Sequence, residues 1–243
     1  MNKVEKIIAS SSGSKLAILL DPDKTGVQEV PLIAERIEEL GASLIFVGGS
    51  TVDRGVTHEF IAVLKDHCSL PVVIFPGDCE QISNEGDALL FLSLLSGENP
   101  EFLIGQQVRS VKKLRNTSLE IIPTGYILID GGTSTSVARV SETKPMDPNA
   151  VEKIVEVALA GKYLGKRLLY LEAGSGAKNP VPLEVIRQVK EATQLPLIVG
   201  GGLRNPEQIA HAIDHGADLV VVGTAFEEKI TFTNKKIKNE HIC

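Results

Sequence analysis

Residues Tyr170-Leu-Glu-Ala-Gly-Ser-Gly-Ala177 form a short apolar segment that ends at Glu172 and opens into a glycine-rich loop. Two similar constructions follow along the chain, Leu197-Ile-Val-Gly-Gly-Gly-Leu-Arg204 and Leu219-Val-Val-Val-Gly-Thr224. Glycines at the end of a buried strand let backbone N–H groups approach and hold an anion. Glycines that merely end strands are the simpler interpretation of any one loop. Three such loops in succession instead predict one phosphate held at the mouth of a parallel barrel.

Buried strands alternate with amphipathic helices along the chain. Continuous apolar runs are typical of parallel strands covered on both faces, and they predict strands at 16–21, 44–49, 71–76, 88–93, 119–130, 166–172, 196–200 and 218–223. Helical periodicity predicts helices at 30–40, 57–66, 101–115, 149–164, 182–193 and 206–215. This alternation indicates an α/β fold, and its repeat number favours a closed barrel over an open sheet.

Two connections depart from the regular pattern. Only residues 77–87 separate the third strand from the fourth, whereas a parallel crossover normally needs a dozen or more residues including a helix. The third helix is therefore predicted to be missing or reduced to a turn. After the fifth strand, the polar residues 131–146 are too many for a simple turn, and we expect this segment to cover a substrate.

Composition and charge narrow the possible functions. The chain has 243 residues and no linker-like shift in composition, so residues 1–243 are expected to form one domain. A net charge of −6 and the absence of any basic run argue against nucleic-acid binding. No window approaches the ~20 apolar residues of a membrane span, and the N-terminus lacks the apolar core of a signal peptide. Together with three scattered cysteines, these features predict a cytoplasmic protein without a membrane span.

Candidate site residues are selected by the rule that such barrels build their active sites at the C-terminal ends of strands. The rule selects Asp21, Ser50 and Glu172. The carboxylate of Asp21 is a suitable oxygen ligand for a hard cation, although a turn or helix-cap role is as common for a single aspartate. No Walker A, GxGxxG or HExxH motif is present.

With these residues assembled, the chain resembles the geranylgeranylglyceryl phosphate synthase family, including the related bacterial heptaprenylglyceryl phosphate synthases. The resemblance covers nearly the whole chain and is carried by Leu20-Asp-Pro-Asp-Lys24, Phe46-Val-Gly-Gly-Ser50, Tyr170–Gly176, Gly200–Gly202 and Val222-Gly-Thr224. The Tyr-Leu-Glu segment is the most specific of these. The Ala-Gly-Ser-Gly form is similar to the group that contains archaeal and Bacteroidetes members. The resemblance implies a modified TIM barrel whose third helix is replaced, in agreement with the short connection.

The resemblance also implies an activity, ligands and site residues. A polyprenyl group, expected to be geranylgeranyl, would pass from its diphosphate to the 3-hydroxyl of sn-glycerol 1-phosphate and give an ether-lipid precursor. Family members bind Mg²⁺ through the positions of Asp21 and Ser50, and they form homo-oligomers, either dimers or hexamers. The positions expected to bind sn-glycerol 1-phosphate are Tyr170, Leu171, Glu172, Ala173, Gly174, Ser175, Gly176, Gly201, Gly202, Gly223 and Thr224.

Glu172 is the candidate catalytic residue. It lies two residues before the glycine loop, where its carboxylate would orient the glycerol hydroxyls and accept a proton. The structural alternative is that Glu172 pairs with a Lys or Arg and only braces the loop.

Two other functions remain open on the sequence. A sugar-phosphate isomerase or aldolase would keep the glycine loops, but it would normally need an inward Lys or an Asp pair, and no clear inward Lys is found. A catalytically silent barrel acting as a binding module is the third possibility. The presence of Asp21, Ser50 and Glu172 argues against it.

Overall fold

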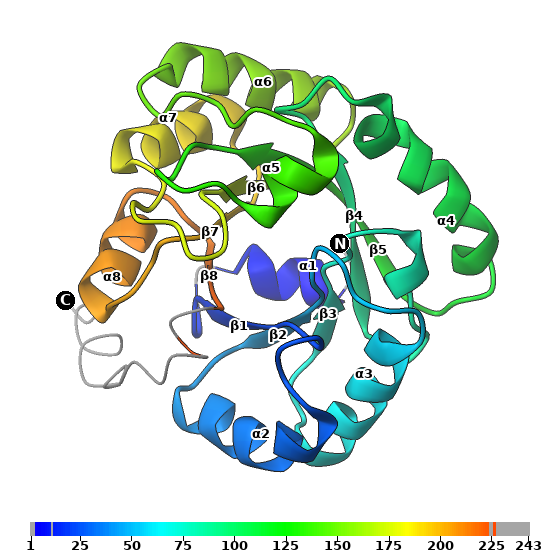
Figure 1. Ribbon diagram of the computed structural model, residues 1–243. Coiled ribbons are helices and arrows are strands. Elements are labelled where there is room, and N and C mark those ends of the chain that lie inside the picture. Colours follow the sequence, from blue (N-terminus) through cyan, green and yellow to red (C-terminus); the bar gives the residue numbers. More distant parts are fainter. Residues whose placement is uncertain (1–2, 11, 224–225, 227–243) are drawn as a thin grey trace.

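Eight parallel strands form a closed barrel in the computed structural model, which describes residues 3–10, 12–223 and 226 (Figure 1). The strands are β1 Leu16–Leu20, β2 Leu44–Val47, β3 Val72–Ile74, β4 Ala88–Leu94, β5 Glu120–Leu128, β6 Leu168–Glu172, β7 Leu197–Gly200 and β8 Leu219–Val222. The ring closes where β8 pairs in parallel with β1, placing Val221 opposite Ala17. The sequence prediction of a parallel α/β barrel is confirmed, and each strand boundary differs from the predicted one by at most two residues.

Helices surround the barrel as in Figure 1. They are α2 Val30–Glu39, α3 Val56–His67, α4 Gln106–Leu114, α6 Val151–Tyr163, α7 Leu183–Thr193 and α8 Pro206–Asp214, with a short 3-10 turn, η1, at Val27–Glu29. The six α-helices named here lie where helical periodicity predicted helices, and η1 was not predicted. One difference is that the predicted helix at 101–115 begins with the π-helical segment η3, Glu101–Gly105. None of the helices within the described residues is both long and apolar enough to cross a membrane.

The third helix of the regular barrel is absent, as predicted. The connection between β3 and β4 contains only η2, a three-residue 3-10 turn at Cys79–Gln81. The buried side chain of Gln81 anchors this connection, because its Nε2 donates to the Gly49 carbonyl at 2.8 Å. The shortened connection leaves one side of the barrel mouth without a covering helix.

Two short helices were not predicted. Helix α1, Lys3–Ile8, covers the N-terminal end of the barrel, where Val4 and Ile8 pack among the inward-facing strand side chains. The amides of Val4 and Glu5 both donate to the Glu120 carboxylate at 2.8 Å. Helix α5, Ser136–Ser141, lies in the polar segment after β5. With α1 covering the N-terminal end, the barrel opens at its C-terminal end.

Candidate active site

A cavity of about 300 Å³ lies at the C-terminal ends of the strands. Its walls come from strands and loops spaced around the barrel and include Asp21, Ser50, Phe75, Tyr126, Glu172 and Gly201. The three polar residues selected from the sequence, Asp21, Ser50 and Glu172, therefore line one cavity, although Asp21 and Glu172 are 151 residues apart along the chain.

The glycine loops line one side of this cavity. Ser175 and Gly176 follow β6, Gly201 and Gly202 follow β7, and Gly223 follows β8. Gly201 has φ of +82°, and a Cβ there would lie only 2.6 Å from the Gly174 nitrogen. The loops after β6 and β7 therefore touch in a way that only glycine permits.

Not every residue expected at the phosphate site presents its side chain there. The side chains of Leu171 and Ala173 pack in the outer core between barrel and helices. Gly174 contacts the site through its backbone, because its N–H donates to Glu172. Thr224 lies outside the described residues.

Glu172 is the most strongly perturbed acid of the cavity. Its side chain is only 6% exposed, and its Oε1 accepts the Gly174 N–H at 2.6 Å. Burial raises the pKa of Glu172 from 4.5 to about 7, against the lowering effects of the Gly174 N–H and the adjacent Tyr170 hydroxyl. No Lys or Arg in the described part of the chain pairs with this carboxylate, so the interpretation of Glu172 as a brace for the loop has no partner there.

Phe75, Tyr126 and Tyr170 form an aromatic cluster that lines the same cavity as Glu172. The centroids of Phe75 and Tyr170 lie 5.1 Å apart, those of Tyr126 and Tyr170 5.3 Å, and those of Phe75 and Tyr126 5.8 Å. The buried hydroxyl of Tyr170 makes no well-formed hydrogen bond within the described residues. Burial, and then the charge of the neighbouring Glu172, raise the pKa of Tyr170 well above its ordinary value.

The part of the cavity that follows β1 carries two carboxylates, those of Asp21 and Asp23. Asp21 Oδ2 lies 3.4 Å from Lys24 Nζ, and Asp21 Oδ1 accepts the Asp23 N–H at 3.2 Å. Partial burial, and then the charges of Asp21 and Asp53, raise the pKa of Asp23. Crowded carboxylates of this kind favour a cation between them.

The residues present suit a Mg²⁺ ion that is coordinated partly by the protein and partly by the substrate. No cluster of three or more His, Cys, Asp or Glu side chains arranged to hold a metal occurs in the ranges that the structure describes. Mg²⁺ typically takes one or two carboxylates and completes its coordination with water and substrate phosphates. Asp21, with the Ser50 hydroxyl on the same cavity wall, offers such an incomplete set of oxygen ligands.

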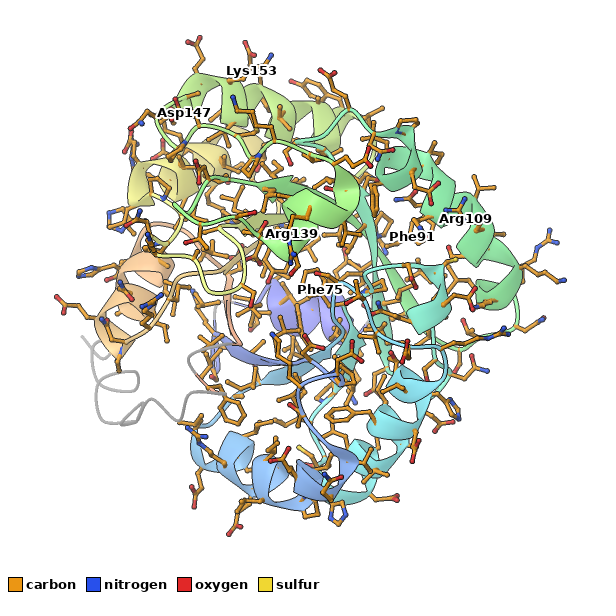
Figure 2. The ribbon with its side chains drawn as sticks, viewed as in Figure 1. Phe75, Phe91, Arg109, Arg139, Asp147 and Lys153 are labelled. Atoms are coloured by element: carbon orange, nitrogen blue, oxygen red, sulfur yellow. The ribbon has the colours of Figure 1, made fainter. Side chains whose placement is uncertain are left out.

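A second, apolar cavity of about 110 Å³ lies beside the missing helix. Its lining includes Ile82, Phe91, Leu92, Phe102 and Val140. It shares Ser50, Phe75, Pro76, Gly77, Tyr126 and Val137 with the larger cavity. Figure 2 shows Phe75 over the barrel opening and Phe91 toward α4. A polar and an apolar cavity therefore meet beside Phe75 and Tyr126.

Among the residues that line the larger cavity, selection of polar strand ends missed Phe75, Tyr126 and Arg204. Tyr126 could have been found from the two-residue period of β5, since it lies in phase with the inward-facing Ile122. Arg204 donates from Nη2 to the Ala177 carbonyl at 3.0 Å, a contact between two loops that no local pattern indicates.

Comparisons with known proteins agree with this geometry. A model of the PcrB family matches residues 11–241. The geranylgeranylglyceryl phosphate synthase of Flavobacterium johnsoniae is 51% identical over 225 residues, covering 92% of this chain and 93% of that protein. The protein of the same name from Pyrococcus abyssi is 41% identical over 246 residues, covering 100% and 97%.

A solved structure gives the same result. The crystal structure of (S)-3-O-geranylgeranylglyceryl phosphate synthase from Thermoplasma acidophilum, in complex with its substrate sn-glycerol-1-phosphate, is 36% identical with a TM-score of 0.85. The alignment covers 93% of this chain and 90% of that one. The chain belongs to the PcrB family, together with these geranylgeranylglyceryl phosphate synthases.

Proposed function

We propose that this chain is a prenyltransferase that joins a polyprenyl group, geranylgeranyl in the first instance, to the 3-hydroxyl of sn-glycerol 1-phosphate. The observation that carries the proposal is the meeting of two unlike cavities beside Phe75 and Tyr126. Three glycine loops suit the phosphate of the acceptor, and the apolar cavity suits an isoprenoid tail. Membership of a family whose named relatives are geranylgeranylglyceryl phosphate synthases supports the same reaction.

The acceptor binds between the glycine loops and Glu172 in this proposal. Backbone N–H groups at Ser175–Gly176, Gly201–Gly202 and Gly223–Thr224 hold the phosphate. Its glycerol hydroxyls then reach toward Glu172, while the backbone of Tyr170–Gly174 shapes the wall. Glu172, as carboxylate, accepts the proton of the 3-hydroxyl as that oxygen bonds to the first carbon of the prenyl chain.

The leaving diphosphate needs compensation of its charge. Asp21 and Ser50 would hold Mg²⁺, which supplies Lewis-acid stabilisation of the departing phosphate oxygens when it is bound. Asp21→Asn should therefore remove most turnover while leaving sn-glycerol 1-phosphate binding nearly intact. A fully active Asp21→Asn enzyme would show that Asp21 is not the ligand.

Self-association is part of the proposal and has a candidate surface. Five of the seven exposed large hydrophobic side chains in the described residues lie on η3, α4 and the end of α6: Ile104, Val108, Val111, Tyr163 and Leu164. These helices are neighbours on the barrel, because they follow the paired strands β4 and β5. Basic Lys112 and Arg115 at α4, with acidic Glu152 and Glu156 on α6, would complement each other across a two-fold axis.

One assay tests the proposed reaction. Pure protein is incubated with Mg²⁺, labelled sn-glycerol 1-phosphate and prenyl diphosphates of several chain lengths, and the organic phase is examined for a labelled prenyl ether. Product formation supports the proposal. Ligand-induced stabilisation by sn-glycerol 1-phosphate without any turnover would instead favour a binding module. We also propose the cytoplasmic location that the sequence led us to expect, and cell fractionation tests it.

A further inference from the structure

Helix α5 lies over the junction of the two cavities. Ser136 and Val137 line the larger cavity, and Val137 and Val140 line the apolar one. Figure 1 shows α5 in front of the barrel opening, between the viewer and the strands. The segment after β5 thus covers the place where a prenyl diphosphate and its acceptor would meet.

Both ends of α5 are fixed to loops of the site. Thr135 Oγ1 caps the helix by accepting the Ala138 N–H at 3.1 Å. The same Thr135 side chain packs against Gly174, where a Cβ would overlap it. At the other end, Asn99 Nδ2 donates to the Ser141 carbonyl at 3.0 Å. The helix therefore joins the loop after β6 to the loop after β4, and its side chains have a defined place over the mouth.

Arg139 carries an unbalanced positive charge on this helix. Its Nη2 donates to Ser136 Oγ at 3.0 Å, and no carboxylate in the part of the chain that the structure describes pairs with it. Figure 2 shows the exposed Arg139 on α5. Its contact with Ser136 places the guanidinium beside a residue that lines the larger cavity. Two other cations, Lys24 and Arg204, line the larger cavity themselves. Lys24 contacts the Asp21 carboxylate, and Arg204 contacts the Ala177 carbonyl.

The proposed reaction defines where negative charge must be met. If the prenyl tail occupies the apolar cavity and its first carbon faces the acceptor beside Glu172, the diphosphate lies at the junction beneath α5. An arginine guanidinium matches phosphate oxygens in a fork of parallel N–H donors. A serine hydroxyl, by contrast, is a weak and readily exchanged partner for that cation.

We propose that Arg139 binds the diphosphate of the prenyl substrate, exchanging its contact with Ser136 for phosphate oxygens. This inference rests on the proposed prenyl transfer. The bond between the first prenyl carbon and the diphosphate oxygen breaks, and its electron pair leaves with pyrophosphate. The glycerol 3-hydroxyl oxygen forms the new bond, and its proton passes to Glu172. Arg139 stays protonated throughout and stabilises the charge that gathers on the leaving group.

Calorimetric titration with inorganic pyrophosphate, with and without Mg²⁺, isolates this contact from the prenyl tail. The full-length wild type is compared with Arg139→Gln and Arg139→Lys. A control variant, Arg109→Gln, removes an exposed arginine of α4 that pairs with Glu101. Arg139→Gln should weaken pyrophosphate binding about 10- to 100-fold, the scale of a lost hydrogen bond to a charged group. The pyrophosphate affinity of Arg139→Lys should lie between those of the wild type and Arg139→Gln. The control variant should bind pyrophosphate as tightly as the wild type does.

Two further measurements separate binding from a structural role. The affinity for sn-glycerol 1-phosphate should stay within twofold in Arg139→Gln, while the KM for prenyl diphosphate rises and kcat falls. Unchanged pyrophosphate affinity in Arg139→Gln, or an equal loss for both ligands, would overturn the inference. Failure of the wild type itself to form product would instead count against the proposed function.

Discussion

Glu172 is a buried carboxylate with a raised pKa. Its side chain is 6% exposed and has no cationic partner in the described residues, so water and counter-charge stabilise its ionised form poorly. A pKa of about 7 keeps it largely ionised just above neutrality while making it a stronger base than an exposed glutamate. The proposed proton acceptor is therefore matched to its task by burial alone.

Replacing Glu172 by Gln tests this role in catalysis. The amide keeps the shape but cannot take a proton, so kcat should fall by about 10²–10⁴, with the affinity for sn-glycerol 1-phosphate reduced much less. In the wild type, kcat should rise with pH through about 7, because only the ionised acid accepts a proton. A collapse of affinity with an unchanged saturated rate would make Glu172 a binding residue.

The same pKa predicts how stability depends on pH. Between pH 4.5 and about 7 the folded chain holds a proton on Glu172 that the unfolded chain has lost, so this residue's contribution to the free energy of unfolding falls as pH rises. The full loss is about 3 kcal/mol, reached above the folded-state pKa. Urea unfolding at pH 5 and pH 8 should therefore show a smaller decrease in the free energy of unfolding for Glu172→Gln than for the wild type. Equal decreases in the two proteins would contradict the raised pKa.

At the scale of residues, the sequence predicted the polar side chains at strand ends but missed two aromatic side chains that face the cavity. Asp21, Ser50 and Glu172 each follow a buried run, so a local rule brings all three to the mouth. Phe75 and Tyr126 belong to apolar runs. The period of β5 indicates that Tyr126 faces the barrel interior, but no local pattern tells whether an inward ring lines a cavity or fills the core.

Among the elements, the loops after β6 and β7 depend on each other. Gly201 and Gly165 both have positive φ, +82° and +85°, but only a Cβ at Gly201 would crowd the site, since Gly165 has open space around it. Alanine at either position costs about 1–2 kcal/mol of backbone strain. Only Gly201→Ala should also displace the Gly174 amide and Glu172, and so weaken sn-glycerol 1-phosphate binding at least tenfold by calorimetry. Equal affinity in the two variants would show that loop contact is not needed.

The elements that the sequence did not predict are short helices. By contrast, the absence of the third helix was predicted from chain length alone, because residues 77–87 are too few for a crossover helix. Helix α5 spans only six residues, too few for a periodic pattern to stand out. Its stability depends on Thr135 and on the contact of Asn99 with Ser141, and the latter joins residues distant in sequence.

For the whole molecule, the exposed apolar surface of α4 and α6 is the feature that the closed barrel leaves unexplained. Val108, 65% exposed on α4, lies within this surface, and Leu32, 71% exposed on α2, lies away from it. Val108→Glu should lower the molar mass measured by light scattering, because a buried charge disrupts an apolar interface. Leu32→Glu is the matched control and should leave the mass unchanged. Equal masses for the wild type and Val108→Glu would exclude this surface as the contact.

The chirality of the acceptor gives the most direct test of the proposed reaction. In the proposed reaction, glycine loops hold the phosphate and one carboxylate accepts the proton of the reacting hydroxyl. Such a site is chiral, because a misplaced hydroxyl leaves buried polar groups unpaired. Initial rates should be measured with sn-glycerol 1-phosphate and with sn-glycerol 3-phosphate, each with geranylgeranyl diphosphate and Mg²⁺. We expect rapid prenyl-ether formation with sn-glycerol 1-phosphate and at most a few per cent of that rate with its enantiomer, about the scale such discrimination reaches. Equal rates with the two enantiomers, or no product from either, would contradict the assignment.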